Sequence, residues 1–384
     1  MTQQAQVSIA TVDLLNLRSM TPGLGGLQRW TRDVALLLAS RGIKVTVFQK
    51  AHTAFESNIA DGIPVVGLSA PMRAWGNYVF TRKLAQRLPP AHPVLFVSQE
   101  LMLGSHFLNT VAVNHGIWWD SDFAPWKLAL NRRLQAAMLR RADKVICVDT
   151  NYINWCHATI PKRAQWQQKL RYIPNYADER AFHFEAKSQS LKLARPRILF
   201  PRRMLDVLTP YWDGRGLMLL LEALTLLRAR GAEFTVEFAG TGRARSAIQD
   251  YADKHGFGDA VECGQYELDE MPSAYARADV VVIPSAGHEG TSLSAVEALC
   301  CGKPVVVTHI GGLPNLVMEN VNGFMCDLDP HSLADALDRA IQASGDRERS
   351  RRVAEDSRLA LGKRRWDDAV WRELASTFRL NSPK

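Results

Sequence analysis

Two glutamates in the stretch "HEGTSLSAVEALCCGKPVV" (288–306) have the spacing most suggestive of chemistry. Glu289 follows an apolar run that ends at 285, and Glu297 lies inside an expected helix that begins near Ser292–Ser294. The first turn of a helix offers unpaired backbone N–H groups that can hold a phosphate. Glu297 lies one turn further in, roughly 5 Å along the axis, where it can accept hydrogen bonds from a ribose diol. Glu289 can reach the group beyond the phosphates, so the spacing predicts a site for a nucleotide-activated ligand.

The same stretch also has a purely structural interpretation. Ser294 and Glu297 fit a capping box, in which the serine caps the helix and the glutamate reaches back to the serine backbone. This interpretation explains Glu297 but gives no role to Glu289, Thr291 and Ser292.

Two sites in the first half of the chain are weaker candidates. "MTPGLGGLQRW" (20–30) places Gly25 and Gly26 between a strand and a helix, where glycine lets backbone N–H groups approach a phosphate. The dinucleotide fingerprint GxGxxG is not met, and a tight turn explains the loop equally well. His115 ends the apolar run "TVAVNH", which suits a ligand site, although a lone histidine is more often structural. "DSD" (120–122) resembles a metal-binding DxD, a pattern short enough to recur by chance.

Arginines gather at one strand end in the second half. "FPRRMLDVLTPYWDGRGL" (200–217) places Arg202 and Arg203 after an apolar run and Arg215 just before the next expected helix. Arginines at two separate positions beside one strand end favour a bound anion, with ordinary surface charge as the alternative.

Composition describes an ordinary globular chain. With 384 residues, two domains are expected; 47% of the residues are hydrophobic and 22% are charged. No apolar run reaches membrane-spanning length, and the start "MTQQAQVSIATV" lacks the pattern of a secretory signal. The six cysteines show no zinc spacing and are expected to be reduced core thiols. We therefore expect a cytoplasmic location.

The net charge of +8 is unevenly distributed. Residues 1–180 carry 21 Lys/Arg against 11 Asp/Glu, whereas residues 181–384 carry 26 against 28. The excess predicts an anionic partner for the first half, and a phospholipid surface, a polyprenyl phosphate or a nucleic acid would qualify. Within it, residues 126–144 combine basic residues with an apolar stripe, so this helix, with Trp118 and Trp119, is a candidate for contact with an anionic membrane on its inner face. A core-packed helix with a solvated basic back is the alternative.

Short apolar strands alternate with helical periods along the chain, which predicts an α/β fold with two doubly wound parallel sheets. The expected domains are residues 1–178 and 196–360, joined by a linker at 179–195, with a final helical segment at 361–384 that returns to the first domain. The strands are expected at 7–12, 44–48, 93–98, 110–115 and 144–149, then at 197–201, 234–240, 259–264, 279–285 and 304–309.

The region 284–317, "PSAGHEGTSLSAVEALCCGKPVVVTHIGGLPNLV", closely resembles the E-x7-E motif of the retaining glycosyltransferases of family 4, which have the GT-B fold. The resemblance runs nearly end to end. The glycines after the first strand, "HG" at 115–116, "IPNYAD" at 173–178, the arginine before "RG" and "FAGTG" all follow in family order. The resemblance implies two Rossmann-like domains with the ligand cleft between them.

The resemblance assigns donor-binding roles to the second half. Glu297 corresponds to the carboxylate that binds the donor ribose, and Glu289 to the one that orients the donor sugar. The backbone N–H groups of Leu293 and Ser294 correspond to the diphosphate cradle. The usual "GFG" after the first glutamate is "GTSLS" here, which places the hydroxyls of Thr291 and Ser292 beside the phosphates or the sugar.

The remaining roles are shared between the halves. Gly25 and Gly26 are implied to face the diphosphate from the first domain, and His115 to lie on the acceptor side near the sugar. Arg203 and Arg215 are the expected cations for the leaving diphosphate; Arg215 stands where the family has a lysine. Glu289, His115 and Arg203 are the expected catalytic residues. Retention in the family is attributed to front-face attack, and we expect no metal or other cofactor.

These inferences favour a retaining transferase that moves a sugar from a UDP- or GDP-sugar to a saccharide or polyprenyl-linked acceptor, in polysaccharide or lipopolysaccharide synthesis, without a nucleic acid partner. Two alternatives stay open: a nucleotide-sugar epimerase of similar build, and a non-catalytic polyanion-binding protein.

Overall fold

The computed structural model describes residues 4–23, 25–117, 119, 124–161, 164–185, 195–204, 214–240, 242 and 244–380. The chain forms two compact units. Unit 1 comprises Met1–Ile173 and Trp366–Lys384, and unit 2 comprises Pro174–Arg365. The chain thus passes from unit 1 to unit 2 at Pro174 and returns at Trp366, within the final helix. Most of the predicted linker, residues 186–194, lies outside the described residues.

Unit 1 contains an eight-stranded sheet in the order β3-β4-β2-β1-β5-β6-β7-β8. Neighbouring strands are parallel except for the antiparallel pair of β3 and β4. Its strands are β1 Gln6–Thr11, β2 Lys44–Ala51, β3 Phe55–Asn58, β4 Pro64–Ser69, β5 Val94–Phe96, β6 Thr110–Asn114, β7 Lys144–Cys147 and β8 Leu170–Tyr172. Its helices are α1 Gly26–Ser40, α2 Gly76–Ala85, α3 Pro125–Arg141, α4 Thr150–Thr159, α5 Ala164–Gln167 and α12 Lys363–Phe378.

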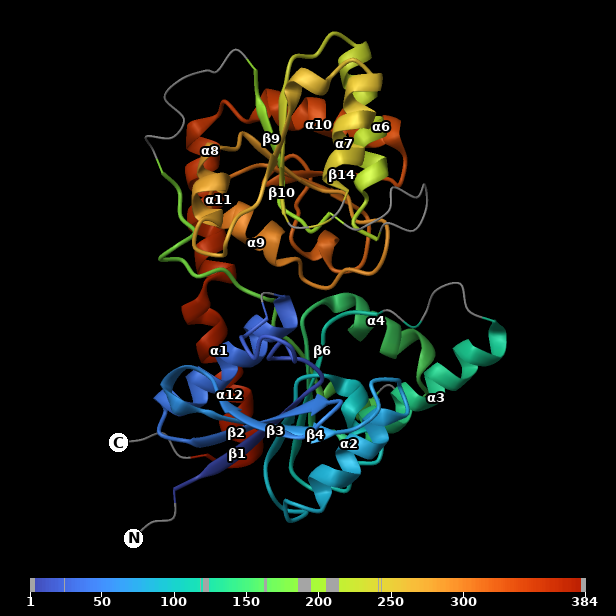
Figure 1. Cartoon of the computed structure of the whole chain (residues 1–384), viewed down its shortest axis with the longest axis vertical. Coiled ribbons are helices and arrows are strands. Elements are labelled where there is room, and N and C mark those ends of the chain that lie inside the picture. The colour runs from blue at the N-terminus through green and yellow to red at the C-terminus, as the bar shows by residue number, and fades with distance from the viewer. Residues whose placement is uncertain are drawn as a thin grey trace. The chain divides into compact units, whose positions relative to one another are not determined.

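Helices cover both faces of this sheet (Figure 1). Buried side chains of α2, α3 and α4 form one core with alternate residues of β1, β5, β6 and β7. On the other face α1 packs beside α12, where the rings of Trp30 and Trp366 meet edge to face at 5.4 Å. The final helix therefore completes the core of unit 1.

Unit 2 contains a six-stranded, fully parallel sheet in the order β11-β10-β9-β12-β13-β14. Its strands are β9 Arg197–Phe200, β10 Thr235–Ala239, β11 Val261–Gly264, β12 Val280–Ile283, β13 Val305–Thr308 and β14 Gly323–Cys326. Its helices are α6 Leu217–Ala229, α7 Arg245–Lys254, α8 Met271–Arg277, α9 Leu293–Cys300, α10 Pro330–Ala343 and α11 Arg347–Leu361.

Five strands of unit 2 are largely buried on both faces, as apolar parallel strands require, whereas the edge strand β11 is partly exposed. Ile198 and Phe200 face the core formed with α6, α7 and α10, while Leu199 faces the core formed with α8, α9 and α11. Figure 1 shows these two helical layers on opposite sides of the sheet. The strand order reverses direction between β9 and β12, and ligands of such sheets bind at the carboxyl edge beside this switch point. The predicted α/β class with two doubly wound sheets is confirmed.

The cysteines are all within the described residues, and none forms a disulfide. Five are buried and Cys263 is partly buried. Burial raises the pKa of the Cys156, Cys300 and Cys326 thiols to about 12, so these residues stay protonated and pack as small apolar side chains.

Candidate active site

The carboxyl ends of β9 and β12 bring arginine and glutamate together in unit 2. The two strands are neighbours, so Arg202 after β9 lies beside the loop 284–292 after β12. Arg202 Nη2 lies 2.5 Å from Glu289 Oε2, and both side chains are largely buried, with 5% and 10% exposure. Arg215 Nη1 approaches the same oxygen at 3.5 Å. Glu289 is therefore held between two cations at the switch point of the sheet.

Ser285 completes this cluster. Its hydroxyl donates to Glu289 Oε2 at 2.9 Å and accepts from Arg202 Nη1. A buried ion pair is stable only when the remaining donors and acceptors also find partners. The fully buried Ser285 meets that need, so the glutamate and the arginine share one fixed geometry.

Glycines let the backbone around Arg215 pack closely on the glutamate loop. Gly216 has φ +74°, and a Cβ there would lie 1.6 Å from the carbonyl oxygen of Pro284. A Cβ on Gly287 would lie 3.0 Å from Gly214 Cα, and the Gly287 N–H donates to Gly214 O at 3.4 Å. Arg215 is thus fixed to the loop that carries Glu289 by residues that have no side chain.

The start of α9 differs from the capping box considered above. The N-cap residue is Ser292, which makes no side-chain cap hydrogen bond, and Ser294 lies inside the first turn. The Ser294 hydroxyl donates instead to Pro201 O at 3.0 Å. The capping-box interpretation is therefore wrong, because Ser294 ties the helix to the end of β9 and does not cap it. The first-turn N–H groups of α9, those of Leu293 and Ser294 among them, have no partner one turn earlier in the helix.

Glu297 lies one turn into α9 and is buried, with 5% exposure. The hydroxyl of Tyr275, from α8, donates to Glu297 Oε2 at 2.9 Å. Burial, and secondarily the negative charge of Glu297, raise the pKa of Tyr275 well above its usual value. The tyrosine is therefore always a donor to this carboxylate. Tyr275 is not predictable from the sequence, because no spacing rule links it to the glutamate motif.

The loop before α9 is anchored by another residue that the sequence analysis did not assign. Thr291 and Ser292 are buried, and the Thr291 carbonyl accepts from Asn175 Nδ2 at 2.8 Å. Asn175 belongs to the motif "IPNYAD", so this motif supports the glutamate loop from within unit 2. Its Oδ1 is buried and makes no hydrogen bond in the described part of the chain.

Arg203 lies apart from this cluster. Its side chain is exposed, and among the described residues it makes no hydrogen bond or ion pair, whereas its neighbour Arg202 is buried against Glu289. Arg203 is the predicted catalytic arginine, whereas Arg202 is the one that contacts Glu289. A role for Arg203 in donor binding stays a prediction.

Unit 1 presents different chemistry at its carboxyl edge. His115 follows β6, and its ring meets Trp30 of α1 edge to face at 5.8 Å. Burial lowers the pKa of His115 to about 4, against a smaller opposing effect of a hydrogen bond with the Val97 backbone. The imidazole is therefore neutral at pH 7. Its Nε2 is buried and has no hydrogen-bond partner within the described residues.

Buried amides hold the turn that carries His115. The Gly116 N–H donates to Asn114 Oδ1 at 3.0 Å, and Asn114 Nδ2 donates to Gln99 Oε1 at 3.3 Å. Gln99 Nε2 donates in turn to Gln135 Oε1 at 2.9 Å and to the Tyr152 hydroxyl at 2.6 Å. This neutral network fixes the backbone on which the histidine lies.

The glycine turn opens α1 in unit 1. Gly25 is the N-cap of α1 without a side-chain cap, and Gly26 begins the helix and is exposed. The side chain of Gln28 fills the space where a Cβ of Gly25 would lie and donates to Asp13 Oδ2. The turn thus exposes a helix N-terminus, which is the arrangement expected of a phosphate cradle.

Comparisons with known proteins agree with this arrangement. Residues 24–180 match the model of "Glycosyltransferase Family 4", and residues 196–343 match that of "Glycosyl transferases group 1". The two matches together cover most of the chain. The chain belongs to the GT-B glycosyltransferases of family 4.

Relatives of this glycosyltransferase differ in their substrates. It is 29% identical over 375 residues to the D-inositol 3-phosphate glycosyltransferase of Thermobifida fusca, covering 86% of this chain and 83% of the relative. It is 26% identical over 167 residues to the lipopolysaccharide 1,2-N-acetylglucosaminetransferase of Salmonella typhimurium, covering 41% and 42%. The relatives therefore share the class of enzyme, which is glycosyltransferase.

Solved structures show the same fold. A sucrose-phosphate synthase from Thermosynechococcus elongatus aligns with a TM-score of 0.76 at 18% identity, covering 97% of this chain and 100% of that one. HepE from Anabaena, solved in complex with UDP, aligns with a TM-score of 0.71 at 17% identity and the same coverage. These likenesses establish the GT-B fold.

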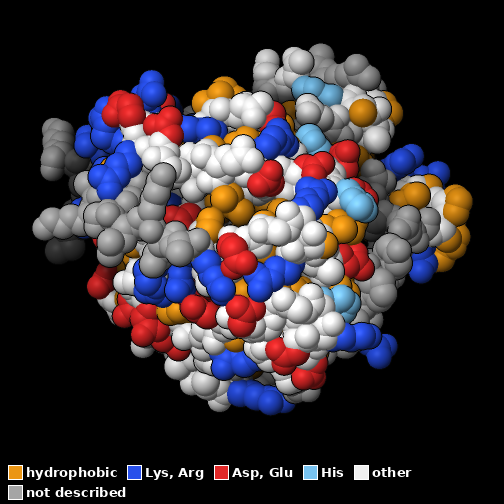
Figure 2. Space-filling model, turned by 90° about the horizontal axis from the view of Figure 1, so that it is seen from above, with side chains coloured by type: hydrophobic (Ala, Val, Ile, Leu, Met, Phe, Trp, Pro, Cys, Tyr) orange, Lys and Arg blue, Asp and Glu red, His pale blue; other side chains and the backbone are white. Residues whose placement is uncertain are grey.

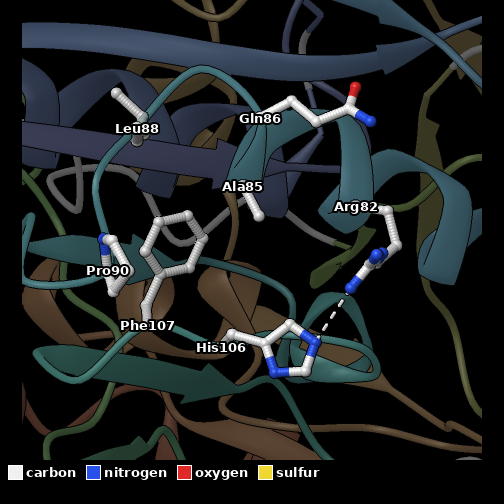
Figure 3. Close-up of a pocket in the computed structure, with 7 residues that line it drawn as sticks. All are labelled: Arg82, Ala85, Gln86, Leu88, Pro90, His106 and Phe107. Carbon is white, nitrogen blue, oxygen red and sulfur yellow. Dashed lines mark hydrogen bonds between the residues drawn. The ribbon is translucent and has the colours of Figure 1, made fainter.

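A pocket of about 210 Å³ lies elsewhere in the glycosyltransferase (Figure 3). Its wall combines apolar and polar side chains from the end of α2 and from the segments that lead into β5 and β6: Arg82, Ala85, Gln86, Leu88, Pro90, His106 and Phe107. The segments before β5 and β6 mark the amino edge of the unit 1 sheet, whereas His115 lies at the carboxyl edge. This pocket is therefore distinct from the site expected of the fold.

The exposed face of α3 is both apolar and basic. Trp126 and Leu130 are 65% and 48% exposed, and Lys127 lies over the Trp126 ring at 5.5 Å. Of the two tryptophans expected beside this helix at a membrane surface, Trp119 does not take the predicted position. Trp119 is buried against Tyr152 and Trp155, which excludes it from a surface contact, and Trp118 lies outside the described residues.

The described residues of the glycosyltransferase form neither a metal-binding cluster nor a membrane-spanning helix. No group of three or more His, Cys, Asp or Glu side chains is arranged to hold a metal ion there, and "DSD" (120–122) lies outside this part. Within the same part, no helix has the length and apolar content to cross a membrane.

Proposed function

We propose that this glycosyltransferase takes the sugar of a UDP- or GDP-sugar, bound by unit 2, and transfers it with retention of anomeric configuration. The observation that carries the proposal is the pair of glutamates beside the N-terminus of α9. Glu289 is clamped by Arg202 and Arg215, and Glu297 is buried one turn into the helix. No interpretation in terms of helix capping accounts for either carboxylate.

Each group of the donor has a matching set of atoms in unit 2. The first-turn N–H groups of α9, from Leu293 and Ser294, suit the diphosphate, and Glu297 suits the ribose hydroxyls. Glu289 suits the sugar hydroxyls, since its two arginine partners hold its carboxylate in one orientation. Thr291 and Ser292 adjoin these groups at the start of the helix.

Transfer then depends on positioning and on stabilising the leaving group. In front-face attack the acceptor hydroxyl approaches on the side from which the nucleoside diphosphate leaves, and a phosphate oxygen takes its proton. Arg215, Arg203 and the α9 N-terminus are the cations and dipoles proposed to stabilise the charge that develops on that phosphate. Such groups make a divalent metal unnecessary, so we propose that the reaction is metal-independent.

The acceptor is proposed to be a saccharide or polyprenyl-linked saccharide, with polysaccharide or lipopolysaccharide synthesis as the pathway class. Support comes from the Salmonella relative, whose name refers to lipopolysaccharide, and from the similar fold of WaaG, described as a glycosyltransferase of lipopolysaccharide biosynthesis. His115, which is neutral at pH 7, is the proposed contact to the reacting sugar on the acceptor side, and Gly25 and Gly26 are proposed to contribute to the diphosphate site.

Membrane contact through α3 is proposed as well, with the enzyme at the inner face of the cytoplasmic membrane. Trp126 and Leu130 are one turn apart, so their exposed side chains share one face, beside exposed basic residues.

Flotation with anionic vesicles at low and high salt tests the membrane contact. Leu130→Ser should reduce binding, whereas Leu108→Ser, at an apolar site 76% exposed outside the helix, should not. Absence of binding at low salt would leave only a structural role for α3.

A panel of UDP- and GDP-sugars tests the proposed function. Each donor is first screened by its effect on the melting temperature and then incubated with and without oligosaccharide acceptors. For at least one donor we expect release of the nucleoside diphosphate. We also expect a new glycosidic bond with the same anomeric configuration as the donor. An isomerised nucleotide sugar formed without acceptor would instead identify an epimerase.

The face drawn in Figure 2 bears on the polyanion-binding alternative. Lys/Arg and Asp/Glu side chains are interspersed over it, and hydrophobic side chains form small separate patches. A continuous field of one sign, which a polyanion would require, is absent from the described residues of that face.

A further inference from the structure

Tyr275 of α8 is a fully buried tyrosine whose ring position is fixed by packing. The ring lies in the core between the sheet of unit 2 and helices α8, α9 and α11. It meets Phe182 edge to face at 5.7 Å between ring centres, with an interplanar angle of 77°. The one polar atom of this side chain is therefore held at a defined point beneath α9.

The hydroxyl of Tyr275 has two acceptors, and both belong to α9. It lies 2.9 Å from Glu297 Oε2 and 3.3 Å from the Ser294 carbonyl. Ser294 in turn donates from its own hydroxyl to Pro201 O, at the end of β9. The glutamate carboxylate, the first turn of the helix and the strand end are thus connected through consecutive hydrogen bonds.

We propose that Tyr275 is a positioning residue for Glu297, holding its carboxylate in the orientation that accepts the ribose hydroxyls of a nucleoside diphosphate. The proposal rests on the proposed function. A carboxylate offers about four lone-pair sites, so the bond from tyrosine leaves acceptor capacity for a ribose. Fixing a flexible glutamate before binding reduces the entropy lost when the nucleotide binds. Tyr275 therefore contributes to the preference for ribose over 2′-deoxyribose.

A merely structural role would also explain the bond, because a buried hydroxyl and a buried carboxylate both need partners. Unit 2 contains a matched pair that separates the two roles. The Tyr266 hydroxyl donates to Oε1 of Glu237, a carboxylate on β10 that is 2% exposed and paired with Arg197 at 2.9 Å. Tyr266→Phe thus removes the same kind of bond from a carboxylate that has no proposed part in the reaction.

The experiment is a calorimetric titration of the full chain with UDP, 2′-deoxy-UDP, GDP and 2′-deoxy-GDP. The quantity of interest is the ratio of the dissociation constants of the deoxy and ribo forms. A bond to a charged group has a net value that corresponds to roughly 10- to 100-fold in affinity, so wild type should prefer the ribo form by about that much. Tyr275→Phe should lower this ratio about 3- to 10-fold, whereas Tyr266→Phe should leave it unchanged.

The double variant Tyr275→Phe/Glu297→Gln distinguishes positioning from an independent effect. If Tyr275 acts through Glu297, the double variant should show the same ratio as Glu297→Gln alone. A Tyr275→Phe protein that melts at a lower temperature but keeps the wild-type ratio would overturn the inference and leave a structural role.

Two further outcomes separate this inference from the function on which it rests. If Glu297→Gln lowers the ratio and Tyr275→Phe does not, only the inference fails. If neither UDP nor GDP binds the wild type, the proposed function fails with it. A ¹⁹F spectrum of the protein with 3-fluorotyrosine at 275 provides a second measurement without loss of the hydroxyl. Its signal should shift more with UDP or GDP than with the deoxy forms, and equal shifts would contradict the inference.

Discussion

The carboxyl edges of the two sheets share an architecture and differ in charge. In unit 2 the edge is ionic: two arginines converge on the single carboxylate of Glu289, which leaves the cluster with an excess of positive charge. In unit 1 the groups that hold His115 at the edge are neutral: His115 is uncharged at pH 7, and amides of Asn114 and Gln99 fix its turn. A fold that places polar groups at strand ends can therefore supply either chemistry, and the local side chains decide which.

The difference is the one expected of the division between donor and acceptor that we propose. A nucleoside diphosphate carries negative charge that increases as it leaves, so the site that binds it needs fixed cations and N–H dipoles. A saccharide acceptor is neutral, and a neutral hydrogen-bonding edge binds it without desolvating a charge.

The largest expected effect concerns the ionic edge. Arg202→Ala would remove the nearer of the two arginines that contact the buried Glu289, and breaking such a pair costs about 3–5 kcal/mol of unfolding free energy. Arg203→Ala, at the exposed neighbouring position, should change stability by less than about 0.5 kcal/mol. Urea denaturation of both variants measures this, and equal losses would show that Arg202 is not the buried partner.

The burial of His115 at the edge of unit 1 predicts an effect of pH on stability that is similar in size to the effect of Arg202→Ala. The pKa of folded His115 is about 4, below its ordinary 6.5, so the unfolded chain binds this proton first as the pH falls. Above about pH 6.5, His115 should therefore leave the unfolding free energy independent of pH. As the pH falls from 6.5 to about 4, protonation of the unfolded chain at His115 should lower the unfolding free energy by on the order of 3 kcal/mol.

The measurement compares wild type with His115→Gln by denaturation at several pH values. The difference between the two should change between pH 6.5 and 4 and stay constant above. A difference that is independent of pH throughout this range would show that the imidazole is not held neutral by burial.

Catalysis should depend on the cations of unit 2. Arg215→Ala and Arg203→Ala should each lower the rate of transfer by about 10²-fold, as the loss of one preorganised donor does elsewhere. The assay is release of nucleoside diphosphate under saturating donor, with Arg230→Ala, a surface arginine paired with Asp335 in the same unit, as control. Full activity in both variants would remove these arginines from leaving-group stabilisation.

The smallest expected effect is that of chelation. If arginines and the α9 N-terminus stabilise the leaving diphosphate, excess EDTA should leave the transfer rate unchanged within error. Loss of activity on chelation with recovery on adding magnesium would overturn this charge assignment and return attention to "DSD" (120–122).

Most of the fold is predictable from the sequence, because the signals of its strands and helices are local. Apolar runs such as "DVVVIPS" and "KVICVD" predicted buried parallel strands, and β12 and β7 occupy them. Four strands are not predicted by such runs: β3, β4, β8 and β14. They are short or lie in mixed segments such as "GFMC", which show no clear periodicity. Strand pairing supplies the stabilisation of these strands, and pairing depends on distant parts of the chain.

The site, like the fold, is predictable only where its residues are close together in the sequence. Glu289, Glu297 and the first turn of α9 follow from spacing along one loop and helix. The choice between Arg202 and Arg203 does not, because both follow β9, and the direction of each side chain depends on the neighbouring strand. Tyr275 and Asn175 reach the site from other segments, so only the folded structure reveals them.

The most direct test of donor binding by unit 2 is calorimetry at pH 7.5. It compares the binding of UDP and GDP to the wild type with their binding to Glu297→Gln and to His115→Gln. Glu297→Gln should weaken binding of the preferred nucleotide roughly 10- to 100-fold, as expected for the loss of hydrogen bonds to a charged acceptor, while the melting temperature barely changes. His115→Gln should bind it within about threefold of wild type, a free-energy change below about 1 kcal/mol. Unchanged binding in Glu297→Gln, or an equal loss in both variants, would contradict the assignment of the donor to unit 2.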